Sequence, residues 1–142
     1  MVEAEVRWIK GLQFVGSADS DHQVLMDADS RVGGEDAGVR PMELLLIGLG
    51  GCTGMDVISI LRKMRIEFDS LRIELKAEKN DEHPKVYRRI EMKYVITGPD
   101  VPEDKFLRAI QLSQERYCSA SAMLRKTADF KTSYQIISRN GR

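Results

Sequence analysis

Cysteine and histidine, the residues that most often hold zinc or carry thiol chemistry, are scarce in this chain. The 142 residues contain two of each: Cys52, Cys118, His22 and His83. Zinc ligands usually lie a few residues apart along the sequence, whereas here the separations between successive cysteines and histidines are 30, 31 and 35 residues. We therefore expect no metal site.

Excess charge and long apolar runs are also absent. The 22 basic residues balance 22 acidic ones and are scattered, so neither nucleic acid nor a membrane is expected as a partner. No run reaches the roughly 18 apolar residues of a membrane span; the most apolar stretch is 44–51. The first residues lack the basic start and apolar stretch of a secretory signal. These absences predict a cytoplasmic protein.

Two common catalytic signatures are missing as well. The sequence has no Gly-x-Ser-x-Gly elbow of the kind that presents a nucleophilic serine. Gly48, Gly50 and Gly51 stand among leucines in an expected helix rather than after a strand, so they do not form a phosphate-binding loop. No cofactor is expected, and the two cysteines remain the candidates for chemistry.

Hydrophobic patterning predicts an α+β fold in a single domain, 1–142. Loose alternation over residues 1–27 indicates short strands, followed by a polar loop from 28 to 40. Pro41 is suited to the first position of a long helix. Two alternating strands, 71–77 and 89–96, are expected to form a hairpin. Two helices, 102–117 and 119–126, and a closing strand, 130–136, are expected after them.

The long helix, from Pro41 to Met64 or Arg65, has features that point to a partner subunit. Its first half, 42–49, is apolar almost all round, which is typical of a buried helix. A helix of this length spans roughly 36 Å, about the diameter of the whole domain, so a second copy is the simplest cover. Its glycines destabilise a helix, and we expect close packing of another backbone to compensate.

Cys52 lies deep in this helix among small residues, which leaves space beside the sulfur. One interpretation is a small buried hydrophobe in a helix crossing; the other is a reactive thiol. A reactive cysteine needs its thiolate form, and Cys52 is some eleven residues past the helix start, beyond reach of the helix dipole. An activating cation must then come from Lys10, Arg31 or Arg40.

Cys118 directly precedes the third helix, and a helix N-terminus favours a thiolate. From the residues alone, Cys118 is thus the better candidate for an ionised thiol, and Cys52 is the better candidate for a thiol beside a pocket. Glu43 precedes Cys52 by nine residues, about 13 Å along a regular helix and close to 180° around it. It can reach Cys52 only through a partner chain, a helix break or an intervening arginine; its simpler role is an acid at the helix N-terminus.

Two segments resemble the OsmC/Ohr family. Residues 41–52, PMELLLIGLGGC, are similar to its Pro-x-Glu-Leu…Cys central-helix signature, and residues 115–121, ERYCSAS, to its second cysteine motif. The order of elements also fits over nearly the whole chain. The resemblance implies antiparallel sheets around a long central cysteine-bearing helix, in an intertwined homodimer with active sites at the subunit interface.

The resemblance also implies a thiol-dependent peroxidase that reduces organic hydroperoxides in oxidative-stress defence. Cys52 would become a sulfenic acid, Cys118 would resolve it as a disulfide, and an external dithiol would reduce that disulfide. Arg31 or Arg40 would hold the Cys52 thiolate, oriented by Glu43. The alternative is a non-enzymatic redox-responsive or small-molecule-binding dimer, since characterised peroxidases of the family have glutamate where this chain has Met42.

Overall fold

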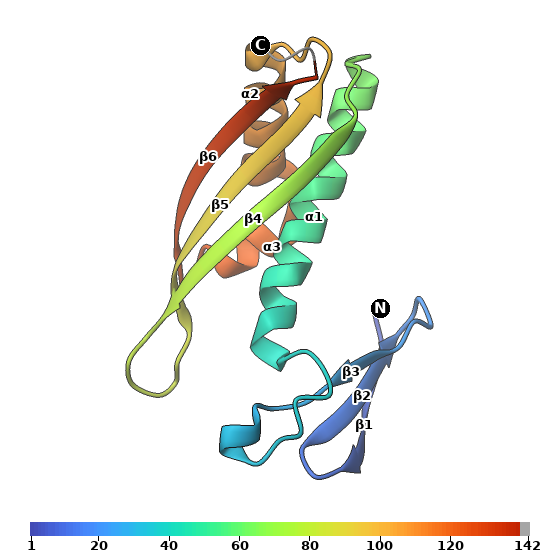
Figure 1. The fold of residues 1–142 in the computed structure, drawn as a ribbon, viewed down its shortest axis with the longest axis vertical. Coiled ribbons are helices and arrows are strands. Elements are labelled where there is room, and N and C mark those ends of the chain that lie inside the picture. The colour runs from blue at the N-terminus through green and yellow to red at the C-terminus, as the bar shows by residue number, and fades with distance from the viewer. Residues whose placement is uncertain (140–142) are drawn as a thin grey trace. The chain divides into compact units, whose positions relative to one another are not determined.

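The computed structural model describes residues 1–139, in two units that divide after Ile47. The first unit, Met1–Ile47, holds a three-stranded antiparallel sheet of β1 (Ala4–Lys10), β2 (Gln13–Ala18) and β3 (Val24–Met26), in that order (Figure 1). Gly11, with φ +53°, makes the tight turn between β1 and β2. After β3 the chain forms a loop with one short 3₁₀ helix, η1 (Ser30–Val32). The strands and the loop expected from the sequence are confirmed.

A buried carboxylate organises that loop. The Asp27 side chain is 2% exposed and accepts hydrogen bonds from the backbone N–H groups of Ala28, Glu35 and Ala37 at 2.7, 3.1 and 3.1 Å. The backbone at Gly34 passes so close to Ala28 that any Cβ there would collide with the Ala28 carbonyl oxygen. The loop that carries Arg31 and Arg40 is therefore defined by side-chain-to-backbone bonds rather than by regular structure.

The cysteine-bearing helix is continuous from end to end, as the sequence predicts: α1 spans Pro41–Lys63. Its buried positions recur every four residues, which places them in one stripe, with Leu49, Thr53, Val57 and Leu61 all fully buried. This stripe places the second half of α1 in the core.

The mean hydropathy of α1 is higher than its short runs of consecutive apolar residues suggest. Its most apolar 18-residue window has a mean hydropathy of 1.9 and at most two charged residues, so the helix could span a membrane by length and composition. The expectation that no segment reaches this threshold was wrong, because glycine, serine and threonine interrupt the run without making the helix polar. In this fold the same composition lets α1 cover one face of a sheet.

The first half of α1 is not buried by its own chain. Leu45 and Ile47 are 47% and 57% exposed in the single chain, so their expected cover by a second copy stays a prediction. The glycines differ from expectation within this chain. A Cβ at Gly50 would lie 3.0 Å from Leu75 Cδ1, a side chain rather than a backbone, and at Gly48 or Gly51 it would meet nothing within 4 Å.

The second unit begins at Gly48 and is built on a sheet ordered β4 (Ser70–Lys79), β5 (Tyr87–Gly98) and β6 (Asp129–Ser138). β4 and β5 form the expected antiparallel hairpin, whereas β5 and β6 are parallel. The expectation of purely antiparallel sheets was therefore wrong for this pair. A parallel pair requires a long crossover, and three short helical elements supply it: α2 (Glu103–Leu112), η2 (Ser113–Tyr117) and α3 (Ser119–Leu124).

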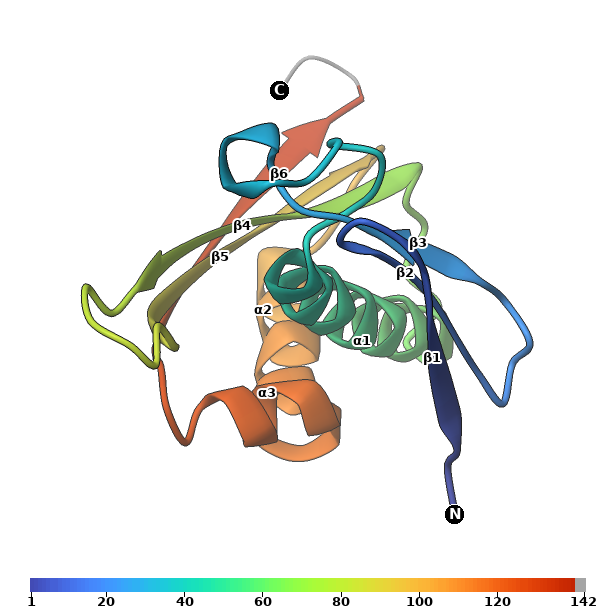
Figure 2. The same cartoon turned by 90° about the horizontal axis from the view of Figure 1, so that it is seen from below.

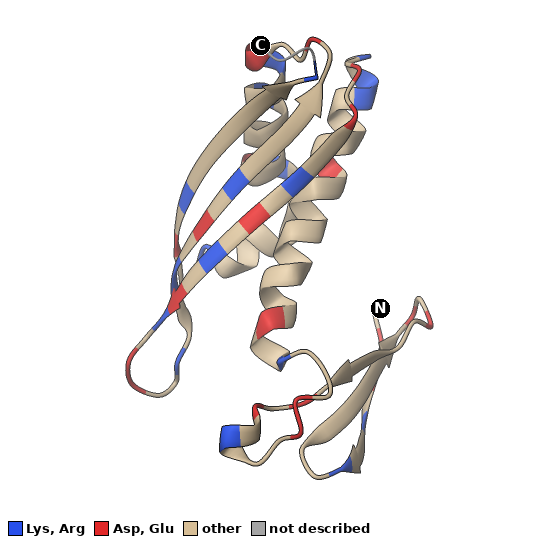
Figure 3. Ribbon diagram, viewed as in Figure 1, with Lys and Arg blue, Asp and Glu red and all other residues tan. Residues whose placement is uncertain are grey.

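Helices cover only one face of this sheet. In Figures 1 and 2, α2, α3 and the second half of α1 lie on the same side of β4–β5–β6. Alternate residues of the central strand β5 point into the layer between them, and Ile90, Met92, Tyr94 and Ile96 are at most 1% exposed. On β4 the intervening positions are charged and exposed, and Figure 3 shows the two signs alternating along it. The core therefore lies between the sheet and these helices.

The helix after α2 departs from the regular pattern. Phe106, Ile110 and Ser113 are buried, but Tyr117, four residues after Ser113, is 52% exposed. The reason is that η2 is a π-helix, whose wider turn is closed by a 2.7 Å bond from Cys118 N–H to the Ser113 carbonyl. The extra residue changes the phase of the helix after Ser113.

A chain of buried hydroxyl groups connects α1, β5 and η2. Thr53 Oγ1 lies 2.7 Å from both the Tyr94 hydroxyl and Ser113 Oγ. Ser113 Oγ donates to Asp56 Oδ2 at 2.9 Å, and Gln114 Nε2 donates to the Tyr94 hydroxyl at 2.9 Å. Thr53, Tyr94 and Ser113 are fully buried, so these bonds offset a desolvation cost that would otherwise oppose folding.

We expect Thr53→Val to lower the free energy of unfolding by about 1–3 kcal/mol, because the isosteric methyl leaves Tyr94 and Ser113 with one bond fewer in a buried site. Urea denaturation at a fixed protein concentration measures the change. The matched control is Thr127→Val, at an exposed hydroxyl, which should shift stability by less than about 0.5 kcal/mol. Equal stability of Thr53→Val and wild type would contradict this role of the hydroxyl chain.

Asp27 predicts an acid-sensitive loop. Burial opposes ionisation of the Asp27 carboxyl, but the backbone N–H groups of Ala28, Ala37 and Glu35 hold its pKa below the usual range. A depressed folded-state pKa contributes stability that is present above the unfolded value of about 3.9 and is lost as pH falls through the folded value. Asp27→Asn should therefore lower stability at neutral pH and flatten its loss in acid, as measured by denaturation across pH 2–7.

The exposed Asp100 provides the control for that measurement. Asp100→Asn should change stability at neutral pH by less than about 0.5 kcal/mol, because the side chain is exposed. If Asp27→Asn followed the wild-type curve across pH 2–7, the bonds from Asp27 to the loop would not contribute to acid stability.

Candidate functional site

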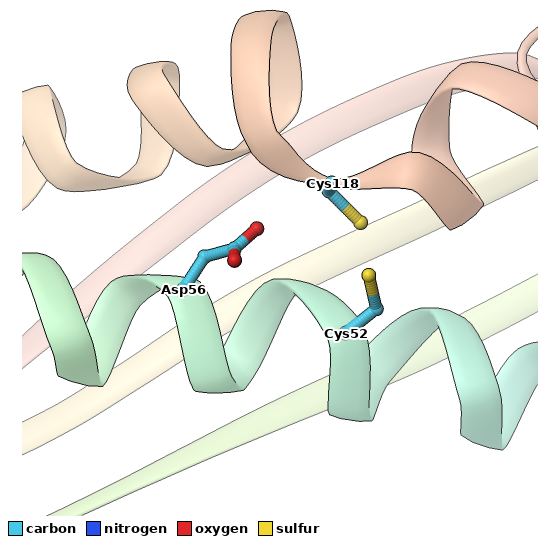
Figure 4. A group of neighbouring side chains, drawn as sticks. All are labelled: Cys52, Asp56 and Cys118. Carbon is cyan, nitrogen blue, oxygen red and sulfur yellow. The ribbon is translucent and has the colours of Figure 1, made fainter.

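The structure brings the two cysteines together. Cys52 comes from α1 and Cys118 from the junction of η2 and α3, and Asp56 follows Cys52 by one helical turn. The two sulfurs and a carboxylate oxygen of Asp56 all lie within 4.8 Å of one another. In Figure 4 the sulfurs point toward each other with the carboxylate beside them. Both thiols are free, so this is the reduced form of a potential disulfide.

Local structure explains how Cys118 reaches α1. The π-turn of η2 ends at Cys118, whose extended backbone (φ −77°, ψ 102°) breaks the helix before α3 begins. Its sulfur is the N-cap of α3 and accepts a hydrogen bond from Ser121 N–H at 3.4 Å. The predicted position of Cys118 at a helix N-terminus is thus confirmed.

The ionisation expected for the Cys118 thiol is not confirmed. Burial of this residue, which is 3% exposed, raises the pKa of its thiol above the ordinary value, and the neighbouring Cys52 raises it further. The hydroxyl and N–H of Ser121 lower the pKa, but the net shift is upward. The expectation that the helix N-terminus favours the Cys118 thiolate was therefore wrong, because a six-residue helix in the core does not offset loss of solvent.

Asp56 is held in place by the buried hydroxyl chain. Ser113 Oγ donates to Asp56 Oδ2 at 2.9 Å and is itself bonded to Thr53. Neither Asp56 nor Ser113 is among the site residues that the sequence predicts. The spacing of Cys52 and Asp56, four residues on one helix, was a usable signal for Asp56. Ser113 gave none, since it lies 57 positions from Asp56 along the chain.

An open apolar groove of about 680 Å³ lies along α1 and β4. Gly50, Gly51, Met55 and Ile73 are among its lining residues. The groove opens along the glycine face of α1. Cys52 is not among the lining residues, so the space expected beside its sulfur is not this groove.

The arginines proposed from the sequence lie in the first unit and are bound to carboxylates there. Arg31 forms a two-bond pair with Asp29, at 2.9 Å for both Nε–Oδ1 and Nη2–Oδ2, and its side chain is 86% exposed. Arg40 pairs with Asp36 at 2.6 Å, and its side chain is 30% exposed. The third candidate, Lys10, forms an ion pair of 3.4 Å with Glu35.

Glu43 has the simpler of its two expected roles. Its Oε1 accepts a hydrogen bond from the Arg40 backbone N–H at 2.7 Å, which is the glutamate half of a capping box at the start of α1. The helix continues unbroken past Cys52. Because Arg31, Arg40 and Glu43 belong to one unit and both cysteines to the other, their action on Cys52 stays a prediction.

Comparison with known proteins identifies the family. A family model described as OsmC-like protein matches residues 33–133. Protein YhfA of Escherichia coli K12 is 37% identical over 136 residues, which cover 96% of this chain and 98% of that protein. The crystal structure of a hypothetical protein from Aquifex aeolicus VF5 has 34% identity and a TM-score of 0.86, with 98% of each chain covered.

A more distant structure, an organic hydroperoxide resistance protein OsmC from Legionella pneumophila, shares the fold with a TM-score of 0.69 at 13% identity, over 95% of this chain and 96% of that one. With a matching family model over most of its length and a close relative over nearly all of it, the chain belongs to the OsmC-like family.

Proposed function

We propose that this protein is a thiol peroxidase that reduces organic hydroperoxides in the cytoplasm. The observation that carries the proposal is the pair of free sulfurs of Cys52 and Cys118, which lie within 4.8 Å of each other. A disulfide bond is about 2.05 Å long, so the sulfurs need move by no more than about 3 Å to form one. The family includes proteins named for organic hydroperoxide resistance.

The burial of the two cysteines supports distinct roles. Cys52 is partly exposed, whereas Cys118 is buried. The first sulfur to react must meet the substrate, and the second need only meet the first. Cys52 is therefore the attacking thiolate and Cys118 the resolving thiol, the assignment that the family resemblance implies.

The reaction runs in three balanced steps. The Cys52 thiolate attacks the terminal oxygen of the hydroperoxide, the O–O bond breaks, and the alkoxide leaves as an alcohol after taking a proton from solvent. Cys52 is now a sulfenic acid. The Cys118 thiol attacks its sulfur, which forms the disulfide and releases water. An external dithiol then reduces the disulfide through a mixed disulfide and restores both thiols.

A homodimer fits the exposed surface of the single chain. Leu45, Ile47 and Met55 on α1 are 47%, 57% and 76% exposed, and Val6 and Trp8 of β1 are 57% and 64% exposed. Apolar surface on this scale usually marks an interaction site. In a dimer, an arginine of the 28–40 loop from either copy could approach Cys52, and covering the groove would give an alkyl hydroperoxide an apolar site.

The proposal is tested by titrating the thiols of the reduced protein before and after one equivalent of cumene hydroperoxide, with mass analysis of the product. Wild type should lose both thiols within seconds as a Cys52–Cys118 disulfide. Cys52→Ser should consume no peroxide. Cys118→Ser should reduce one equivalent and leave a sulfenic acid that dimedone traps.

Two results would count against this scheme. If Cys118→Ser failed to react with the hydroperoxide and Cys52→Ser still reacted with it, the roles of the two cysteines would be reversed. Wild-type thiols that survive for minutes would instead favour the redox-responsive or small-molecule-binding dimer.

The activating cation is identified by the alkylation rate of Cys52, measured with iodoacetamide in the Cys118→Ser background. If an arginine stabilises the thiolate, replacing it with glutamine should slow alkylation about tenfold or more at pH 7, because a thiol of ordinary pKa is only a few per cent ionised there. Arg31→Gln and Arg40→Gln are compared, with Arg72→Gln on the solvent-exposed β4 as the control. Unchanged rates in both loop variants would remove both arginines.

A further inference from the structure

We propose that the reduced protein binds one soft divalent cation of the zinc class at Cys52, Asp56 and Cys118. The two sulfurs and one carboxylate oxygen would be the protein ligands, and a water molecule would occupy a fourth position. Sequence spacing does not predict this site, because Cys118 comes from a segment far along the chain from Cys52 and Asp56. The proposal goes beyond the peroxidase reaction and depends on no step of it.

The distances between the three donor atoms suit tetrahedral coordination. All three lie within 4.8 Å of one another. Zinc binds thiolate sulfur at about 2.3 Å and carboxylate oxygen at about 2.0–2.2 Å, so two sulfurs on one tetrahedral ion lie about 3.8 Å apart. The donors therefore need to close by only about 1 Å, which side-chain rotations can supply. The partly exposed Cys52 and Asp56 leave an open side for a fourth ligand.

The donor chemistry selects the class of ion. Two thiolates with one carboxylate favour zinc and similar soft or borderline ions over magnesium or calcium, which prefer oxygen ligands. Within residues 1–139 no lysine or arginine forms an ion pair with Asp56, whose hydrogen-bond partner there is Ser113. A dication would offset two of the three negative charges that two thiolates and a carboxylate would otherwise place together.

The surrounding hydrogen bonds orient the ligands in advance. Ser113 Oγ, fully buried, donates to Asp56 Oδ2 at 2.9 Å and is fixed by Thr53. Ser121 N–H donates to Cys118 Sγ at 3.4 Å. Outer bonds of this kind hold metal ligands in position and contribute to affinity. They also leave the second oxygen of Asp56 available to the ion.

Metal binding and oxidation would compete for the same sulfurs. Binding of the ion to the two thiols releases two protons. A hydroperoxide that oxidises the loaded pair, with uptake of two protons, yields the disulfide, the free cation, an alcohol and water. The cation would therefore protect the reduced pair, and disulfide formation would release it.

Cobalt(II) titration of the reduced protein under anaerobic conditions provides the test, because cobalt reports thiolate ligation and tetrahedral geometry in its absorption spectrum. We expect one cobalt per chain, with thiolate charge-transfer bands and intense tetrahedral d–d bands, and displacement by zinc. Cys52→Ser and Cys118→Ser should each lower the zinc affinity and weaken the charge-transfer bands. Asp56→Asn should keep those bands and weaken zinc binding by about tenfold or more in competition with a chromophoric chelator.

Asp104→Asn, at an exposed carboxylate in the first turn of α2, is the matched control and should keep wild-type affinity. The proposal is overturned if cobalt binds without thiolate charge transfer, if Asp56→Asn binds zinc as tightly as wild type, or if the disulfide form binds it equally well. Circular dichroism checks that Asp56→Asn is folded; if it is not, the cysteine variants and the disulfide form decide. The cobalt titration uses no peroxide. A negative result there would overturn the metal-site proposal without bearing on the peroxidase proposal.

Discussion

The hydroxyl of Thr53, buried where α1, β5 and η2 meet, is the contact on which the geometry of the cysteine pair depends. Its bonds to Tyr94 and Ser113 attach α1 to the sheet and to the π-helix at the same point. Cys52 precedes Thr53 by one residue, and Cys118 follows directly after η2. Burying the Thr53 hydroxyl has a desolvation cost, and its bonds to Tyr94 and Ser113 offset that cost. These bonds therefore favour one arrangement of α1, β5 and η2. That arrangement places the two sulfurs side by side.

The π-turn of η2 is the second part of the same constraint. It uses one more residue per turn than an α-helix, ends in the extended backbone of Cys118, and leaves Tyr117 on the surface. The resulting burial raises the pKa of the Cys118 thiol, so Cys118 is suited to react with a sulfur already beside it. Cys52, on the more open helix, is suited to meet a substrate from outside. A difference in burial between two chemically identical residues is what supports their separate roles.

Much of the fold followed from local patterns. Alternation of apolar and polar residues predicted the short strands of the first unit and the hairpin of β4 and β5, and Pro41 marked the start of α1 because proline is suited to the first helical position. Patterns of this kind do not determine how strands pair across long connections. The parallel pairing of β5 with β6 was missed for that reason. The apolar residues Leu45 and Ile47 are exposed in a single copy of the chain, so the sequence alone does not say what covers them.

For the site, the sequence by itself determined which residues can carry chemistry: two cysteines in motifs of the OsmC-like family. It also determined the start of α1 and the place of Glu43 as an acid at the helix N-terminus, because both depend on neighbouring residues. Only the tertiary structure decided that Cys52, Asp56 and Cys118 meet, that Ser113 orients Asp56, and that burial raises the pKa of the Cys118 thiol. The physical reason is that desolvation and contacts between distant segments depend on packing, which no local spacing specifies.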